Sequence, residues 1–291
     1  MKFELSIIIP TLNYSSHLNN LINNICQQLN YKKFQIIIIN QSHRGVSKTR
    51  KSKVIYKYTS KKNLSRARNI GLDLAVGKFI CFLDDDIFLT PNYFLKCLNK
   101  FKKNKNISIF FSKILNKEDG KIYSRYMSNN SEKINYNNNL MCLSSGMWAK
   151  KSDLLRHKIK FDERLGLGAK YGSSEETDFL MQCLLKNFNI FFFSDIQVYH
   201  RKYNLNKLPI KKIISRSYSY GMGRGALLAK YSKIKPMWFL FNLFFSIFPQ
   251  LIISFFSLLI FDIKKFSRFF FSFLGRVVGL LNFFLKKNHY D

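Results

Sequence analysis

The sequence has 291 residues, of which 48 are Lys or Arg and 17 are Asp or Glu, so its formal net charge is +31. Hydrophobic residues make up 47% and aromatic residues 16%, which excludes an intrinsically disordered chain. The five cysteines are scattered without CxxC spacing, which argues against a zinc knuckle or a disulfide framework and favours a reducing cytosol.

The excess of positive charge indicates an anionic partner, which could be nucleic acid, an anionic membrane or a phosphate-bearing substrate. Proteins that bind nucleic acid usually gather Lys and Arg in one stripe. Here Lys is spread along the chain, and residues 236–261 contain no charged side chain. We therefore expect an anionic membrane surface as a partner, and no nucleic acid.

The first part of the chain alternates between predicted strands and helices. Short apolar runs, several of them rich in β-branched residues, predict strands at 6–9, 35–40, 54–58, 79–83 and 107–111. Apolar residues spaced along one face predict helices at 16–30 and 64–74, and Thr90 followed by Pro91 predicts a capped helix over 91–102. This alternation predicts an α/β fold with a mostly parallel sheet flanked by helices.

The second part is less regular. Residues 121–139 are polar and rich in Asn, which predicts a loop or an irregular hairpin. A second lobe follows, with a helix at 176–187 and a strand at 190–193. Residues 208–231 predict a basic helix that is broken at the three closely spaced glycines around Gly223.

Three adjacent carboxylates, Asp84, Asp85 and Asp86, directly follow the predicted strand at 79–83. The carboxyl end of a strand is where open α/β sheets bind ligands. Adjacent carboxylates repel one another unless a cation neutralises them, and oxygen ligands suit Mg²⁺ or Mn²⁺. A solvated acidic turn is the other interpretation, but acids are scarce in this chain and the position favours a cation site.

A second acidic cluster, Glu175, Glu176 and Asp178, follows a glycine-rich segment and falls at the start of a predicted helix. The helix dipole favours carboxylates there, so a purely structural helix start would also explain them. The functional interpretation is a general base that projects from the helix start into a cleft beside the metal.

Four segments occur in the order IIIPTLN, NLSRARNIGLDLAVGKFICFLDDD, SSGMWAKKSDLL and FDERLGLGAKYGSSEETDF. With them the sequence resembles, over about residues 3–205, the family 2 inverting glycosyltransferases with the GT-A fold. It is similar to the non-processive bacterial enzymes that build capsule, lipooligosaccharide or O-antigen. A processive synthase is not expected, because no QxxRW segment follows.

The resemblance implies a GT-A fold, Rossmann-like, of the nucleotide-diphospho-sugar transferase type. It also implies a metal-dependent inverting glycosyltransferase, with Mn²⁺ or Mg²⁺ as its cofactor. The donor would be a nucleotide-diphosphate sugar, foremost a UDP-sugar, and the acceptor a hydroxyl of a cell-surface polysaccharide or of a lipid-linked saccharide.

Roles for individual residues follow from the same resemblance. The nucleotide sugar would be bound by Thr11, Asn13, Asn40, Arg68, Asp84 and Asp85. The metal would be held by Asp86 and His200, the acceptor side would include Gly146 and Trp148, and the general base would be Glu176, preceded by Glu175. Asn40 stands where the family usually has an Asp that reads uracil, and Glu176 stands where Asp is commoner. An amide both donates and accepts, so base recognition remains feasible.

The expected organisation has three parts. A GT-A catalytic domain at 1–205 would comprise a nucleotide-sugar-binding half at 1–115 and an acceptor-side half at 116–205. A basic helical connector at 206–235 and a membrane-associated helical hairpin at 236–291 would follow it.

The first apolar segment of the tail is long enough to cross a bilayer, but polar residues recur along it and Pro249 interrupts it. If it spanned, the basic residues Lys264 and Lys265 would be exported, against the positive-inside tendency. We therefore expect a peripheral or re-entrant hairpin on the cytoplasmic face of the inner or cell membrane. A buried pair of core helices is the alternative.

Two other functions stay open at this point. The chain could be a non-catalytic, basic membrane-binding subunit derived from a transferase, against which the intact Asp84, Asp86 and Glu176 argue. It could also be a nucleotidyltransferase, but these usually carry a glycine-rich phosphate loop after the first strand, and IIIPTLNYSS has none.

Overall fold

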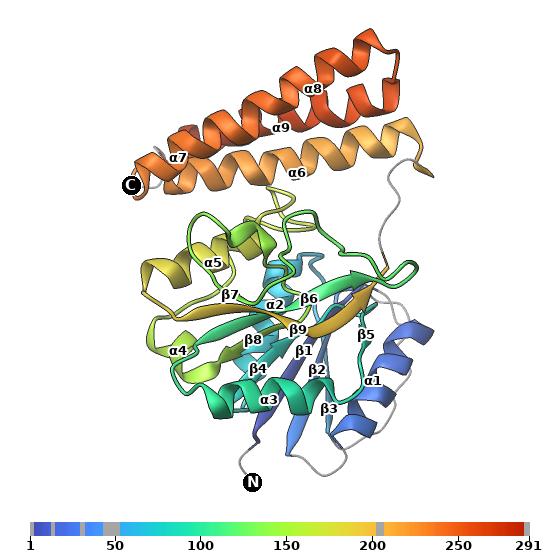
Figure 1. The fold of residues 1–291 in the computed structure, drawn as a ribbon, viewed down its shortest axis with the longest axis vertical. Helices are drawn as coiled ribbons and strands as arrows, with labels where there is room; N and C mark the ends of the chain where they lie inside the picture. Colours follow the sequence, from blue (N-terminus) through green and yellow to red (C-terminus); the bar gives the residue numbers. More distant parts are fainter. Residues whose placement is uncertain (1–2, 13–14, 30–32, 43–52, 202–206, 288–291) are drawn as a thin grey trace. The chain divides into compact units, whose positions relative to one another are not determined.

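The computed structural model describes residues 3–12, 15–29, 33–42, 53–201 and 207–287 (Figure 1). The chain divides into two compact units. The first comprises Met1–Phe161 and Phe179–Lys202, and the second comprises Asp162–Asp178 and Tyr203–Asp291. The domain boundaries expected from the sequence stay a prediction.

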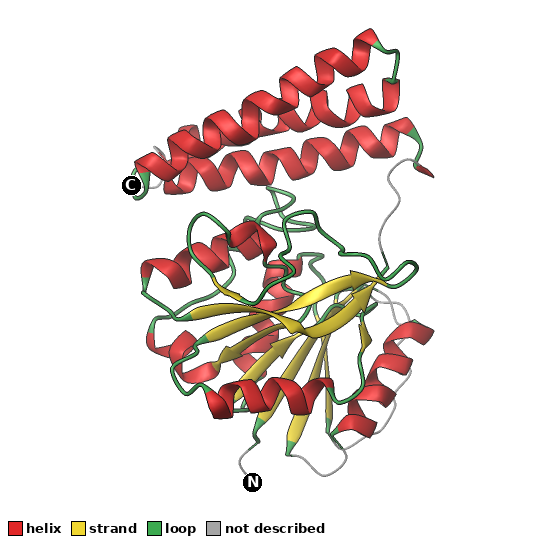
Figure 2. Ribbon diagram, viewed as in Figure 1, coloured by secondary structure: helices red, strands yellow, loops and turns green. Residues whose placement is uncertain are grey.

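The described residues of the first unit form a nine-stranded mixed sheet in the order β3-β2-β1-β4-β8-β6-β9-β5, with β7 paired to β9 (Figure 2). Its strands are β1 (Leu5–Thr11), β2 (Phe34–Asn40), β3 (Val54–Tyr58), β4 (Phe79–Phe82), β5 (Phe88–Leu89), β6 (Ile109–Asn116), β7 (Glu132–Lys133), β8 (Met147–Lys150) and β9 (Ile190–His200). The pairs β3–β2, β2–β1, β1–β4 and β6–β9 are parallel, and β8 pairs antiparallel with β4 and β6. The expected α/β fold with a mostly parallel sheet is confirmed.

Helices flank this sheet: α1 (Ser16–Gln28), α2 (Leu64–Leu74), α3 (Tyr93–Lys103), α4 (Lys151–Arg156) and α5 (Glu175–Leu185). Helix α2 begins where the Asn63 side chain accepts a hydrogen bond from the backbone N–H of Arg66, as an N-cap does. The predicted cap of α3 at Thr90 is wrong. The Thr90 hydroxyl instead donates to the carbonyl of Gln197, and α3 begins at Tyr93.

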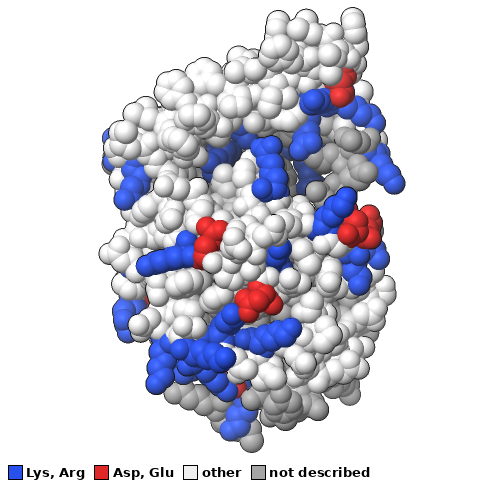
Figure 3. All heavy atoms as spheres, viewed as in Figure 1, with Lys and Arg blue, Asp and Glu red and all other residues white. Residues whose placement is uncertain are grey.

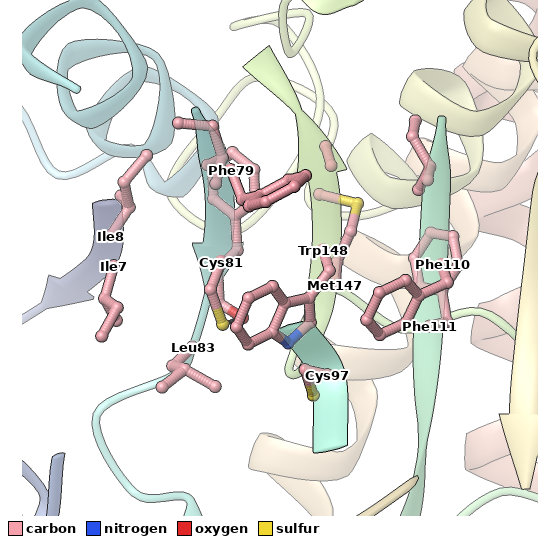
Figure 4. Close-up of a cluster of buried hydrophobic side chains, with 14 of the residues drawn as sticks. Ile7, Ile8, Phe79, Cys81, Leu83, Cys97, Phe110, Phe111, Met147 and Trp148 are labelled. Atoms are coloured by element: carbon pink, nitrogen blue, oxygen red, sulfur yellow. Dashed lines mark hydrogen bonds between the residues drawn. The ribbon is translucent and has the colours of Figure 1, made fainter. Parts of the chain in front are cut away.

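The core of the first unit lies on both faces of the sheet. Every residue of β1 and β2 is buried, which explains the run of four isoleucines in β2. Trp148 of β8 is completely buried and stacks on Phe110 with ring centroids 5.8 Å apart (Figure 4). Its Nε1 donates to the Tyr93 hydroxyl at 3.0 Å. Trp148 is therefore a core residue, contrary to the expectation that it lines the acceptor side.

The second unit is helical: α6 (Ile210–Tyr231), α7 (Pro236–Asn242), a π-helical segment (Leu243–Ile247), α8 (Phe248–Leu259) and α9 (Ile263–Lys287). Helix α6 runs without the predicted break. Its glycines instead allow α9 to approach closely: a Cβ at Gly221 would overlap the backbone of Ser272, and one at Gly225 the backbone of Arg276. Small residues that bring two helix backbones together are typical of tightly packed helix pairs.

Candidate active site

The acidic turn Asp84–Asp86 follows β4 at the carboxyl edge of the sheet, where β1 and β2 also end. The strands β1, β2 and β4 are parallel neighbours, so Thr11 at the end of β1 lies next to this turn. The Thr11 hydroxyl donates to Asp85 Oδ2 at 2.5 Å. The sheet thus brings together two segments that are separated by more than seventy residues in the sequence.

Asp84 is held by partners from two other elements. Arg68, on α2, places Nη2 3.3 Å from Asp84 Oδ1, and the Ser145 hydroxyl donates to Asp84 Oδ2. Arg68 is 1% exposed, donates also to the Ser144 hydroxyl, and lies over the Phe161 ring at 5.3 Å. A guanidinium this deeply buried acts by fixing the Asp84 carboxylate, which makes Arg68 a positioning residue in this structure.

Asp85 has a raised pKa. Burial, reinforced by the negative charges of Asp86 and Asp84, raises the pKa of Asp85 to about 6, although the hydrogen bond from Thr11 acts to lower it. Asp85 therefore keeps a proton at pH values where an ordinary carboxyl has lost it.

Asp86 turns toward solvent and meets His200 at the end of β9. His200 Nε2 lies 3.2 Å from Asp86 Oδ1, and Nδ1 lies 2.8 Å from the carbonyl oxygen of Arg201. Because a carbonyl and a carboxylate can each only accept, His200 makes both hydrogen bonds when both of its ring nitrogens carry a proton. Burial acts to raise the pKa of Asp86 and to lower that of His200, but their mutual hydrogen bond and charges outweigh it, so the pKa of Asp86 is lowered and that of His200 raised.

The pair Asp86–His200 is suited to a divalent cation. Within the described ranges of the chain, no three His, Cys, Asp or Glu side chains gather as a complete metal site. A carboxylate oxygen and an imidazole nitrogen are nevertheless accepted ligands of Mn²⁺, and Mg²⁺ commonly takes one or two carboxylates and completes its shell with substrate phosphates and water. The hydrogen bond from Nδ1 to a carbonyl is the arrangement that orients a metal-binding histidine.

The remaining expected residues have more local roles in this structure. Asn40 is 4% exposed, and its side-chain oxygen accepts from the backbone N–H of Ser42 at 3.0 Å, which stabilises the turn after β2. Gly146 has a φ of 91°, and its N–H donates to the Phe82 carbonyl, so this position favours glycine for its backbone. Asn13 lies outside the described residues.

The second acidic cluster lies at the start of α5 and belongs to the second unit up to Asp178. Asp178 is completely buried, with Lys230 Nζ at 2.6 Å from Oδ1 and the Tyr231 hydroxyl at 2.9 Å. Glu175 is 7% exposed, whereas Glu176 is half-buried. Of the three acids, Glu176 therefore has the most access to a substrate, and Asp178 has a structural role.

Sequence reasoning missed several partners of these acids. Ser144 and Ser145 hold Arg68 and Asp84, and Lys230 bridges Asp162 and Asp178. The Ser-Ser-Gly run before β8 was a visible signal, because small polar residues beside a glycine suit a tight turn that approaches an acidic site. Lys230 had no such signal, since it is one of many lysines on a basic helix.

An acidic turn at the carboxyl edge of a mostly parallel α/β sheet is the arrangement of nucleotide-binding α/β enzymes. Residues 6–157, more than half of the chain, match the model of glycosyl transferase family 2. The chain belongs to glycosyl transferase family 2 and is, by that membership, a glycosyltransferase.

The chain is also similar to individual proteins of known name or structure. The chain is 31% identical over 131 residues to the minor teichoic acid biosynthesis protein GgaB of Bacillus subtilis (strain 168), a match that covers 38% of this chain and 14% of GgaB. Among solved structures, it is similar to S. aureus TarS 1-349 in complex with UDP-GlcNAc, with a TM-score of 0.58 and 15% identity over 91% of this chain and 90% of that one. A complex of TarS 1-349 with UDP gives a TM-score of 0.56 and 16% identity, over 79% of this chain and 70% of that one. At these identities the structural likeness shows the GT-A-like fold.

Proposed function

We propose that this protein transfers a sugar from a UDP-sugar, with inversion, to a hydroxyl of a cell-surface polysaccharide or of a lipid-linked acceptor. The observation that carries the proposal is the acidic turn Asp84–Asp86 with its partners Thr11, Arg68 and His200, within a family 2 domain. A uridine donor is favoured because TarS, which shares the fold, binds UDP and UDP-GlcNAc.

In this proposal the residues of the acidic turn have separate tasks. Asp84, fixed by Arg68 and Ser145, accepts hydrogen bonds from the donor's ribose. Asp86 and His200 would hold Mn²⁺ or Mg²⁺, which, when bound, stabilises the charge on the departing nucleoside diphosphate.

The acceptor hydroxyl needs a base on the face opposite the leaving group. Glu176 is the acid assigned to that task, because it is the most accessible member of its cluster. Attack in line with the departing diphosphate inverts the anomeric carbon. One protein carboxylate as base suffices for a single displacement.

A phosphate-bearing glycopolymer is the acceptor class that we favour over the capsule, lipooligosaccharide and O-antigen types. The net charge of +31 suits a polyanion, and on the face shown in Figure 3 Lys and Arg are scattered over several places rather than gathered in one stripe. The relative GgaB is named for minor teichoic acid biosynthesis. We place the reaction at the cytoplasmic face of the cell membrane.

The test is hydrolysis and transfer from a panel of UDP-, GDP-, CDP- and ADP-sugars with Mn²⁺ or Mg²⁺. We expect turnover of a UDP-sugar that EDTA abolishes, and a loss of ~10²-fold or more in Asp86→Asn. The matched control is Asp73→Asn, an exposed acid of α2 that pairs with Lys160. Full activity in EDTA would overturn the metal assignment, and inertness toward the whole panel would favour a non-catalytic subunit.

A further inference from the structure

The apolar helices of the second unit expose their hydrophobic residues and bury their polar ones. Large hydrophobic side chains are exposed along α7, the π-helical segment and α8. Those with at least 40% of their surface exposed include Phe241, Phe245, Phe248, Ile252, Phe256 and Leu259. Ser254 and Ser257 of α8, in contrast, are 2% and 1% exposed. This polarity is the inverse of that of a water-soluble helix.

Polar contacts inside the unit explain the inverted pattern. The guanidinium of Arg276 on α9 donates to the backbone carbonyl of Ser246 in the π-helical segment. Arg224 of α6 donates to the Asn242 side chain at 2.5 Å and lies over the Trp238 ring at 5.7 Å. Asn242 and the backbone carbonyl of Ser246 thus face the neighbouring helices, and the large apolar side chains named above are left exposed.

Helix α9 lies between α8 and α6 and contacts both (Figure 1). The glycine contacts give the relative direction of α6 and α9. Gly275 lies against Tyr218, and four residues later in both helices Gly279 lies against Met222. The two helices are therefore parallel and in contact along most of their length. The outer surface of α6 is polar and basic, with exposed side chains at Lys211, Lys212 and Arg216.

We propose that α7, α8 and α9 lie flat in the interface of an anionic bilayer, with the outward face of α8 among the acyl chains and α6 on the aqueous side, and that neither apolar segment spans. The inference rests on the membrane location given under Proposed function and specifies its geometry. Pro236–Leu259 and Ile263–Leu285 are each long and apolar enough to cross a membrane. Length alone does not distinguish spanning from lying in the interface.

The packing of α6 against α9 distinguishes an orientation that spans the bilayer from one that lies in its interface. If α9 crossed the bilayer, α6, which lies parallel to it over several turns, would enter the hydrocarbon layer beside it. This would carry Arg216 and Lys230 toward the hydrocarbon, which is costly for each charge. With the helices in the plane of the interface, the same packing leaves α6 in water and α8 in lipid.

Charge complementarity identifies the occupant of the apolar face as an anionic lipid surface. The turn that joins α8 to α9 contains Phe261, which is 85% exposed. The exposed Lys264, Lys265 and Arg268 follow on α9. Asp262 is the single acid in the sequence from residue 207 to residue 287. Exposed aromatic residues bordered by Lys and Arg suit insertion beside acidic head groups.

The depth of three positions along the apolar face tests the geometry. Phe245, Ile252 and Leu259 are 68%, 54% and 58% exposed. The first and last are fourteen positions apart in the sequence, or ~21 Å along a helix. The 291-residue protein, with Cys26 replaced by Ala, carries one environment-sensitive label at a time through Phe245→Cys, Ile252→Cys or Leu259→Cys. Labelled proteins are bound to vesicles of phosphatidylcholine and phosphatidylglycerol, and quenchers at known depths in the lipid chains locate each label.

We expect the three labels to lie at one shallow depth within about 5 Å of each other, and a Ser215→Cys label on exposed α6 to remain unquenched. Depths that differ by about 15 Å or more along the series would overturn the in-plane geometry in favour of a spanning segment. Quenching of the α6 label as deep as the others would overturn it as well.

The contribution of the basic residues after the α8–α9 turn to membrane binding is tested with the same vesicles. The triple variant Lys264→Gln, Lys265→Gln, Arg268→Gln should weaken binding roughly 5-fold for each charge removed. The matched triple Lys96→Gln, Lys158→Gln, Lys186→Gln removes the same charge from exposed sites of the first unit and should bind as the parent does. Equal weakening in both variants, or no binding of the parent to vesicles, would overturn the proposal.

Donor hydrolysis by the protein without vesicles is measured in parallel and reports separately on the proposed function. A protein that hydrolyses a UDP-sugar but fails the depth test loses only the membrane geometry. A protein that binds in the plane but hydrolyses no nucleotide sugar loses only the enzymatic proposal.

Discussion

Lys230 of α6 and Asp178 of α5 form an ion pair in which the carboxylate is completely buried and Nζ lies 2.6 Å from Oδ1. The same ammonium lies 2.8 Å from Asp162 Oδ2. One lysine therefore attaches both ends of the segment Asp162–Asp178 to the helical part of the second unit. That segment contains Glu176, so the position of the expected base depends on a contact to a helix more than fifty residues away.

The first prediction concerns this ion pair. Lys230→Met should lower the free energy of unfolding of the second unit by about 3 kcal/mol, because removing one partner leaves a buried carboxylate without its counter-charge. Lys233→Met, at an exposed lysine of the following turn, should leave stability within about 0.5 kcal/mol of the parent. Thermal unfolding in a mild detergent measures both. Equal stability of the two variants would contradict the prediction.

The second prediction is an acid-dependent loss of stability through Asp162. Burial alone would raise the pKa of Asp162, but the hydrogen bonds from Arg164 and the charge of Lys230 outweigh it and hold the pKa well below its ordinary value. Because the folded-state pKa is depressed, this contribution to stability is fully present above the unfolded-state pKa of about 3.9. It is lost as the pH falls further.

The melting temperature, followed between pH 7 and pH 2, should therefore stay level above about pH 5 and decline below about pH 4. Asp162→Asn should melt lower than the parent at pH 7 and show a shallower decline in acid. A decline of the same steepness in the variant and the parent would assign the acid sensitivity to other groups.

The third prediction uses the close approach of α6 and α9. Alanine normally stabilises a helix by up to ~1 kcal/mol relative to glycine. Gly225→Ala should nevertheless destabilise the second unit by roughly 1–3 kcal/mol, because the added Cβ would overlap the Arg276 backbone. Ser215→Ala, at an exposed site of the same helix, should be neutral or slightly stabilising. Higher stability of Gly225→Ala would show that the helices are less tightly packed.

The fourth prediction separates the three acids of α5. Glu176→Gln should reduce kcat for donor turnover by ~10²-fold with little change in the donor KM, as expected for a lost general base. Glu175→Gln should keep most of the activity, and Asp178→Asn should lose stability rather than catalysis because its side chain is buried in an ion pair. An inactive Glu175→Gln beside an active Glu176→Gln would move the base by one position.

Local sequence patterns were sufficient to predict an element where the residues of that segment alone determine its secondary structure. The four isoleucines of β2, the helical segment of α2 at 64–74 and the apolar run that begins β9 were each predicted from nearby positions. They were insufficient where the structure of a segment depends on a partner that is distant in the sequence. The short strand β8 and helix α4 were missed, because β8 is defined by its pairing with β4 and β6 and both elements are too brief to show a period.

The same distinction applies to the candidate site. The three adjacent carboxylates could be identified from the sequence because their order and scarcity are local facts. Their unequal environments could not, since Asp84 faces Arg68, Asp85 faces Thr11 and Asp86 faces His200, each from a different strand or helix. The glycines of α6 led to the wrong prediction of a helix break for a related reason. Their role in close packing is evident only from the neighbouring helix α9.

The contacts of Asp84 have a consequence for the thermodynamics of donor binding. Its carboxylate is restrained by Arg68 and Ser145, and Arg68 is itself enclosed by Ser144 and Phe161, so this acceptor occupies a single rotamer before any ligand arrives. Fixing a free polar side chain on binding typically costs about 0.5–1.5 kcal/mol of conformational entropy. At Asp84 that ordering is already complete on folding, so calorimetry of nucleotide binding should show a smaller entropic penalty for the parent than for Ser145→Ala.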